Sequence, residues 1–170
     1  MNPIEILLIE DDPGDIRLTA EALKESGFPF NLNVVKDGDE ALNYLFKVGR
    51  YSDKPTPELV LLDLNLPTLS GKDVLKIIKR DRDLSRIPIV VLTTSRDEED
   101  IKVSYSLQAN SFITKPMDLE RFIDVIKATE NYWVNIVRLP NRDDSQKPEP
   151  EKPVNKPKEQ VKASSGPERI

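Results

Sequence analysis

The sequence contains no cysteine and no histidine among its 170 residues. The first absence excludes disulfides and thiolate nucleophiles, the second excludes imidazole bases, and together they remove the usual ligands of zinc and haem. The chain also lacks an apolar run near the ~20 residues that a membrane-spanning helix needs. Its first residues include neither a cationic leader nor a small-residue cleavage site. We therefore expect a cytoplasmic protein whose chemistry depends on carboxylates, hydroxyls, amides and lysine.

Basic residues are outnumbered by acidic ones, 25 to 30. The formal net charge is -5 and the sequence pI is about 5.0, so the chain has no basic excess of the kind that binds phosphate backbones. We therefore expect no direct nucleic-acid partner and no membrane partner.

Short apolar runs alternate with segments of helical periodicity along the chain. The run at 59–62 has no alternation of polar and apolar residues, which is typical of a strand buried on both faces in a parallel sheet. The expected strands span 4–9, 31–35, 59–62, 87–93 and 111–114, and the expected helices span about 13–26, 39–48, 71–80, 96–109 and 119–137. This alternation predicts an α/β fold with helices on both faces of a parallel sheet. The expected architecture is a flavodoxin-like (βα)5 three-layer sandwich with strand order 2-1-3-4-5.

Polar side chains stand at the ends of four of the predicted strands: Glu10 and Asp11, Asp63, Thr93, and Lys115. These four strands are neighbours in the order 2-1-3-4-5, so their ends meet at the carboxyl edge of the sheet. Three carboxylates in one partly buried cluster repel one another strongly. The set therefore favours a Mg²⁺ ion, which prefers oxygen ligands, beside the lysine.

Four segments resemble the receiver domain of two-component response regulators: LLIEDDP, LVLLDLNLP with the following SG, IPIVVLTTS and SFITKP. They stand in the family order over about residues 3–137. The resemblance implies that Asp63 is the phosphoacceptor, that Glu10 and Asp11 are the acidic pair near Mg²⁺, and that Asn65 supplies a backbone carbonyl to the ion. Asp12, the third acid in the first segment, is then expected to cap the following helix.

The same resemblance assigns the residues of a conformational switch. Thr93 is expected to be the switch hydroxyl and Lys115 the lysine that contacts the phosphoryl group. Pro116 is expected to follow a cis peptide bond. Phe112 falls at the position of the switch aromatic, although on the sequence alone it is a core residue of a strand. Phosphorylation is expected to reshape the face made by the fourth helix, fifth strand and fifth helix.

The sequence predicts a receiver domain over residues 3–138 and a disordered tail over 139–170, which contains six prolines and no aromatic residue. A narrower similarity is to the small stand-alone regulators paired with phytochrome-type histidine kinases, in EDDPGDIRL, RYSDKPTPELVLLDLNLP and NYWVNIV. It implies a sensor histidine kinase, of phytochrome type, as the phosphoryl donor.

Apolar residues near the end of the last helix lie beyond the length needed to cover the sheet: Tyr132, Trp133, Ile136 and Val137. Two interpretations are open. Either they form a partner surface, giving a homodimer through the side of the fourth and fifth helices, or they close the edge of the sheet.

Three functions compete at this stage. The first is a signalling phosphoacceptor that catalyses only its own phosphorylation and dephosphorylation. The resemblance to receiver domains implies that Asn65 and Ser95 help to set its hydrolysis rate. The second is a pseudo-receiver adaptor that binds partners without phosphorylation. The third is a phosphatase of the haloacid-dehalogenase type, which would need an aspartate where Asn65 stands, two residues after the nucleophile.

Overall fold

The computed structural model describes residues 3–25 and 27–140, in which five strands alternate with five α-helices. The strands are β1 (Ile4–Ile9), β2 (Phe30–Val35), β3 (Leu59–Leu62), β4 (Ile89–Thr93) and β5 (Ser111–Thr114). The helices are α1 (Pro13–Glu25), α2 (Gly38–Leu45), α3 (Gly71–Arg80), α4 (Glu98–Ser106) and α5 (Leu119–Glu130). All strands pair in parallel, in the order β2-β1-β3-β4-β5. The predicted flavodoxin-like fold is confirmed.

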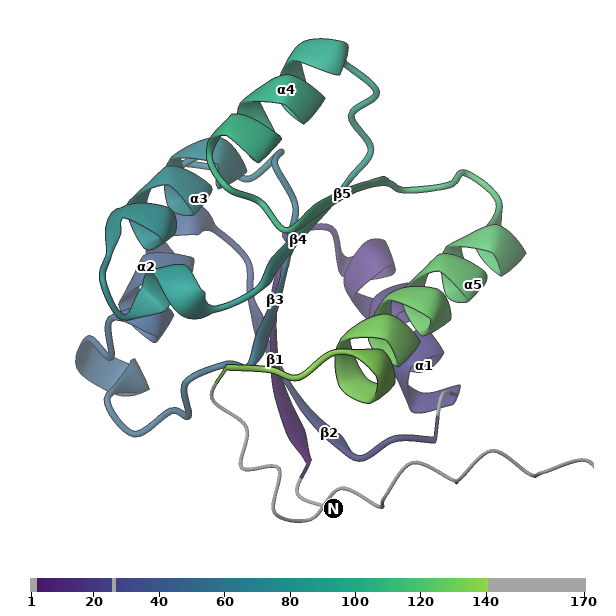
Figure 1. Cartoon of the computed structure of the whole chain (residues 1–170), viewed down its shortest axis with the longest axis horizontal. Coiled ribbons are helices and arrows are strands. Elements are labelled where there is room, and N and C mark those ends of the chain that lie inside the picture. The colour runs from purple at the N-terminus through teal and green to yellow at the C-terminus, as the bar shows by residue number, and fades with distance from the viewer. Residues whose placement is uncertain (1–2, 26, 141–170) are drawn as a thin grey trace, which may run out of the picture.

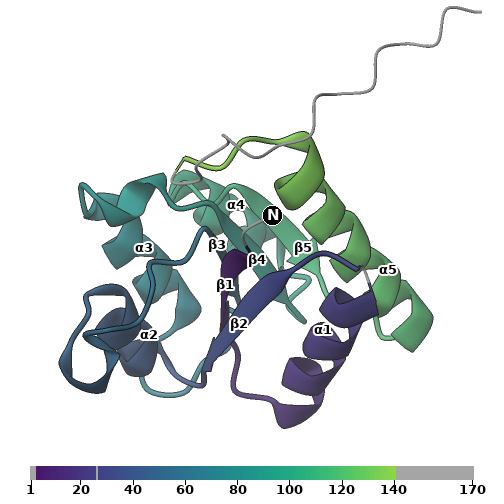
Figure 2. The ribbon, with the colours of Figure 1, turned by 90° about the horizontal axis from the view of Figure 1, so that it is seen from below.

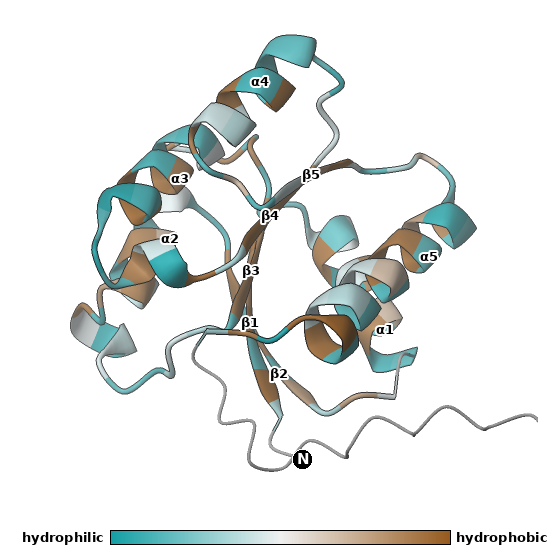
Figure 3. Ribbon diagram, in the orientation of Figure 1, coloured by the Kyte–Doolittle hydropathy of each residue, from teal (hydrophilic) through white to brown (hydrophobic). Residues whose placement is uncertain are grey.

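The helices form two layers around the sheet. Helices α1 and α5 lie side by side on one face, and α2, α3 and α4 cover the other (Figures 1 and 2). In Figure 3 the strands are largely hydrophobic, and a cluster of buried hydrophobic residues packs on each face of the sheet. Both faces of the sheet are therefore shielded from water, as the parallel arrangement requires.

Strand β3 shows why an unbroken apolar run was needed. Leu59 and Leu61 pack into the core beneath α1 and α5, whereas Val60 and Leu62 pack into the core beneath α2 and α3. All four side chains are at most 2% exposed. Because successive side chains of a strand point to opposite faces, a strand covered on both sides has no position left for a polar residue.

Helices α2 and α4 end earlier than expected, and each is followed by a non-glycine residue in the left-handed conformation. After α2, Lys47 has φ 61°, and after α4, Gln108 has φ 67°. The amides that follow close the helix ends, with Val48 N–H donating to the Asn43 carbonyl and Ala109 N–H to the Ser104 carbonyl. This is the Schellman motif, whose left-handed position usually holds glycine. Lysine and glutamine give no such signal in the sequence.

The last helix changes character before its expected end. Helix α5 ends at Glu130, and Asn131–Ile136 continue as a π-helical turn. Val134 is buried there and Trp133 packs against the core, whereas Tyr132 and Ile136 are exposed. The segment thus partly closes the core beneath α5, and the predicted homodimer stays a prediction.

The predicted tail falls mostly outside the described residues. Of its described part, Leu139 is buried in the core beneath α1 and α5, and Pro140 is exposed. Among the helices that the structure describes, none combines the length and the apolar character required to cross a membrane.

Candidate functional site

Backbone pairing brings the predicted polar residues together at one edge of the sheet. The Asp63 amide donates to the Ile9 carbonyl at 3.0 Å, which places Asp63 beside Glu10. The Lys115 amide donates to the Thr93 carbonyl at 2.7 Å. Four of these side chains are buried: those of Glu10, Asp63, Thr93 and Lys115. The register of the parallel strands therefore builds the cluster.

The loop after β3 is held against the start of α3. Ser70 caps this helix, its hydroxyl accepting from the Asp73 amide at 3.2 Å. The Gly71 amide donates to the Leu64 carbonyl at 3.0 Å. A Cβ atom at Gly71 would lie 2.2 Å from the Asp63 carbonyl oxygen and 2.6 Å from the Leu64 Cα. Only glycine permits this approach, so α3 fixes the backbone that carries Asp63.

We expect Gly71→Ala to destabilise the protein by about 2 kcal/mol, because the new methyl group overlaps backbone atoms that must shift. The free energy of unfolding in urea measures this loss. Gly27→Ala is the matched control: its Cβ meets no atom within 4 Å, so only its φ of +79° makes it unfavourable, at about 1 kcal/mol. Equal stability of Gly71→Ala and the wild type would contradict the packing argument.

Lys115 donates to three carboxylates at once. Its Nζ contacts Glu10 Oε2, Asp15 Oδ2 at 2.7 Å and Asp63 Oδ2 at 2.9 Å. The sequence placed Glu10 and Asp63 in one cluster with Lys115 and gave no role to Asp15. Asp15 lies in the first turn of α1, and Asp12 Oδ1 accepts its amide at 2.8 Å, as expected of a cap. An acid in the first turn after an acidic strand end was the available signal.

The three buried charges change one another's pKa. Burial raises the pKa of Glu10 to about 7, despite the opposing contact with Lys115. Burial also acts to raise the pKa of Asp63, but hydrogen bonds from the Asn65 amide and Lys115 outweigh it, and the pKa lies below its ordinary value. The pKa of Lys115 is raised, because its three carboxylates outweigh its burial. Asp63 is therefore an anion at neutral pH, beside a permanent cation.

The acids at this edge suit a divalent cation. Oxygens of Glu10, Asp11 and Asp63 all lie within 4.8 Å of one another, and carboxylate oxygens are the ligands that Mg²⁺ prefers. Asp11 is exposed, so one side of the group faces solvent. Asn65 is also exposed. Its backbone amide donates to Asp63 Oδ1 at 3.0 Å, and its side-chain Nδ2 donates to Thr93 Oγ1 at 3.5 Å.

Asp15→Asn is expected to weaken Mg²⁺ binding by about three- to tenfold, because the cluster loses one of its negative charges. The fold should persist, since Lys115 keeps Glu10 and Asp63 as partners. Calorimetric titration with Mg²⁺ measures the affinity. Glu21→Gln serves as control, since it removes an exposed acid farther along α1. Unchanged affinity in Asp15→Asn would show that Asp15 lies outside the field of the ion.

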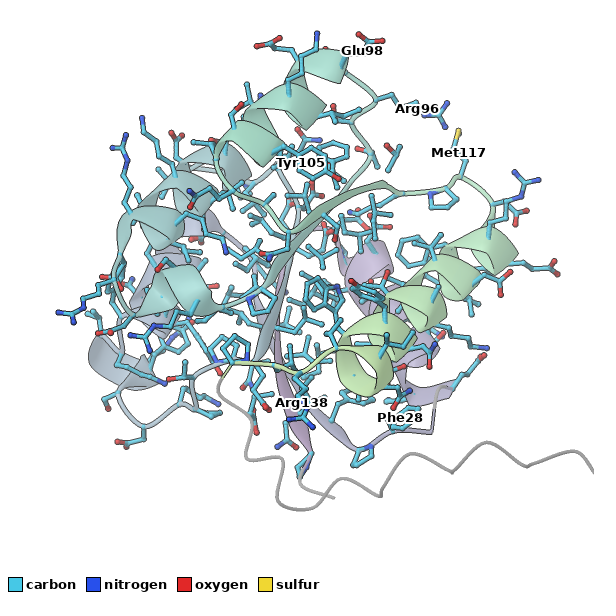
Figure 4. The ribbon with its side chains drawn as sticks, viewed as in Figure 1. Phe28, Arg96, Glu98, Tyr105, Met117 and Arg138 are labelled. Carbon is cyan, nitrogen blue, oxygen red and sulfur yellow. The ribbon has the colours of Figure 1, made fainter. Side chains whose placement is uncertain are left out.

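The predicted switch residues lie on β4 and β5. Thr93 is fully buried, and Phe112 is half-buried against the core beneath α2 and α3. The Phe112 amide donates to the Tyr105 hydroxyl at 3.2 Å. Tyr105 on α4 and Met117 after β5 are exposed on this side of the molecule (Figure 4).

The expected cis bond before Pro116 is wrong for this structure: no peptide bond among the described residues is cis. A proline bond allows either isomer at a small difference in energy, so the residue type alone did not decide it.

A family model described as the response regulator receiver domain matches residues 6–127. The chain belongs to the response regulator receiver family. This receiver is 44% identical to the response regulator Rcp1 of Synechocystis sp. over 138 residues, which are 81% of this chain and 94% of Rcp1. The haloacid-dehalogenase alternative finds no support.

Two solved structures extend the comparison. A phosphorylated cyanobacterial phytochrome response regulator, RcpA, superposes on this receiver with a TM-score of 0.80 at 45% identity. The match covers 82% of this chain and 99% of RcpA. The Mn²⁺-bound form of Rcp1 has a TM-score of 0.79 at 43% identity, covering 81% of this chain and 99% of that structure. The receiver is thus similar in sequence and fold to regulators of phytochrome signalling.

Proposed function

We propose that this protein is a response regulator in which Asp63 accepts a phosphoryl group from a sensor histidine kinase. The observation that carries the proposal is the setting of the Asp63 carboxylate. It is buried and anionic, it contacts Lys115 at 2.9 Å, and it shares a cluster of oxygens with Glu10 and Asp11. A buried carboxylate with these neighbours, in a receiver, is suited to act as a nucleophile toward phosphorus.

The proposed step transfers one phosphoryl group. An Asp63 oxygen attacks the phosphorus of a phosphohistidine, the phosphorus–nitrogen bond breaks, and the imidazole keeps the electron pair and takes up a proton. Lys115 offsets charge on the phosphoryl oxygens, and the Thr93 hydroxyl donates to one of them. Magnesium, held by Glu10, Asp11, Asp63 and the Asn65 backbone carbonyl, would neutralise further charge on the transferring group.

The output is proposed to be a changed protein surface. In the acyl phosphate state, Thr93 moves toward the phosphoryl group and Phe112 turns farther inward. Because the Phe112 amide bonds to the Tyr105 hydroxyl, movement of β5 also shifts α4. The exposed side chains of Tyr105, Met117 and Leu119 then present a different face to a partner.

The proposed donor is a kinase of the phytochrome type. RcpA is a cyanobacterial phytochrome response regulator and shares 45% identity with this chain. The match covers 82% of this chain and 99% of RcpA, so it extends over the domain that carries the cluster.

Phosphotransfer from a labelled kinase tests this proposal. A phytochrome-type histidine kinase, phosphorylated beforehand with labelled ATP, is mixed with the protein, and a sensor kinase of another type serves as the control donor. We expect faster transfer from the phytochrome-type kinase. Equal, slow transfer from both would contradict the pairing, and no transfer from either would favour the pseudo-receiver adaptor.

A further inference from the structure

The loop after β4 is fixed mainly through Ser95. The Ser95 amide donates to Thr93 Oγ1 at 3.4 Å, and its carbonyl accepts from the Thr114 hydroxyl at 3.3 Å. The Ser95 hydroxyl donates to Asp100 Oδ2 at 2.5 Å. Ser95 therefore connects the end of β4 and β5 to the first turns of α4.

Asp100 is held in turn by a cation from another helix. Lys72, in the first turn of α3, pairs with the second carboxylate oxygen of Asp100. The Asp100 side chain is only 17% exposed. Its hydrogen bonds with Lys72 and then Ser95 keep its pKa below the ordinary value. The ion pair ties α4 to the helix start that packs, through Gly71, on the Asp63 backbone.

A further contact that the structure describes for this loop is the cap of α4, in which the Asp97 carboxylate accepts from the Glu99 amide at 2.9 Å. Thr94, Arg96 and Asp97 are all exposed, and Figure 4 shows Arg96 pointing away from the molecule. Without apolar anchors, the position of such a segment depends on its hydrogen bonds. The hydroxyl of Thr93, the last residue of β4, is one of the groups that lower the pKa of Asp63.

From these contacts we propose that Asp100 and Lys72 are positioning residues, which hold Thr93 toward Asp63 through Ser95 during phosphoryl transfer. The inference rests on the proposed function of Asp63. Neither residue touches the reacting atoms; Asp100 orients Ser95, and Lys72 orients Asp100. Loss of either contact loosens the loop, and the Thr93 hydroxyl then spends less time where it stabilises the transferring group.

The test is the rate at which acetyl phosphate phosphorylates the full chain in Mg²⁺, followed by intact-protein mass. We expect Asp100→Ala and Lys72→Met to slow phosphorylation by about three- to tenfold, the cost of a loosened donor. Lys72→Arg should restore the rate. Lys102→Met is the matched control. Lys102 lies on α4, as Asp100 does, and forms an exposed pair with Glu98 at 4.0 Å.

Thr93→Ala separates positioning from general weakening of the fold. If Asp100 acts through Thr93, adding Asp100→Ala to Thr93→Ala should change the rate less than 1.5-fold. A full additional slowing would overturn the proposal, and so would wild-type rates in both single variants. If Asp100→Ala does not fold, the phosphorylation rate of Lys72→Met alone tests the proposal. The Mg²⁺ affinity of Lys72→Met should equal that of the wild type.

The same experiment distinguishes failure of the proposed function from failure of the positioning role. If the wild-type protein takes up no phosphoryl group, the proposed function fails and the positioning role fails with it. If the wild type is phosphorylated and the variants match it, the function stands and the positioning role alone is overturned.

Discussion

Asp63→Asn is expected to abolish phosphorylation by kinase and by acetyl phosphate alike, because an amide oxygen is too weak a nucleophile to attack phosphorus. The fold should survive the change. The amide oxygen can still accept from the Asn65 backbone, and Lys115 keeps its contacts with Glu10 and Asp15. We expect the free energy of unfolding to change by less than about 1 kcal/mol, because loss of the Asp63 contact with Lys115 is offset by relief of the repulsion between the Asp63 and Glu10 carboxylates.

Asp12→Asn is the control for this prediction. It removes an exposed acid from the same edge of the sheet and retains an oxygen that can accept the Asp15 amide. Phosphorylation at a rate near that of wild type is expected. The nucleophile would have to be sought elsewhere if the Asp63 variant were still labelled to the same extent as the control.

Lys115→Met is expected to lower the free energy of unfolding by about 3 kcal/mol at neutral pH, since it leaves buried carboxylates without their cation. The Glu10 and Asp63 side chains are 3% and 7% exposed, so water offers them little compensation. Mg²⁺ should restore part of the loss, because the ion supplies positive charge to the same oxygens. Urea unfolding with and without Mg²⁺ measures both effects.

The matched control for this variant is Lys127→Met. Lys127 pairs with Glu25 at 2.6 Å, but its side chain is 39% exposed. Loss of a surface pair changes stability by less than about 1 kcal/mol, and Mg²⁺ should not affect it. Equal losses in the two variants would show that the carboxylates around Lys115 are protonated or hydrated rather than ionised and buried.

The sequence predicted the sheet and its polar edge because both follow from simple rules. An unbroken run such as 59–62 requires cover on both faces, and parallel strands bring their carboxyl ends to one edge. Once the strand order was expected, Glu10, Asp63 and Lys115 had to be neighbours. The backbone register places Asp63 beside Glu10, because the Asp63 amide donates to the carbonyl of Ile9.

Side-chain contacts between helices could not be predicted in the same way. The contact of Asp15 with Lys115 depends on how α1 turns after its cap, and the pairing of Lys72 with Asp100 depends on how close two helix starts lie. Both involve charged residues of a kind that usually face solvent. The early end of α2 likewise rests on Lys47 in a left-handed conformation, which its residue type disfavours.

We expect this receiver to form one acyl phosphate, in a step that depends on a divalent ion. The most direct measurement is the intact mass of the wild-type protein after incubation with acetyl phosphate, with Mg²⁺ and with excess chelator. A single addition of about 80 Da, the mass of one phosphoryl group, is expected in Mg²⁺ and none in chelator. No addition in either condition, or equal addition in both, would contradict it.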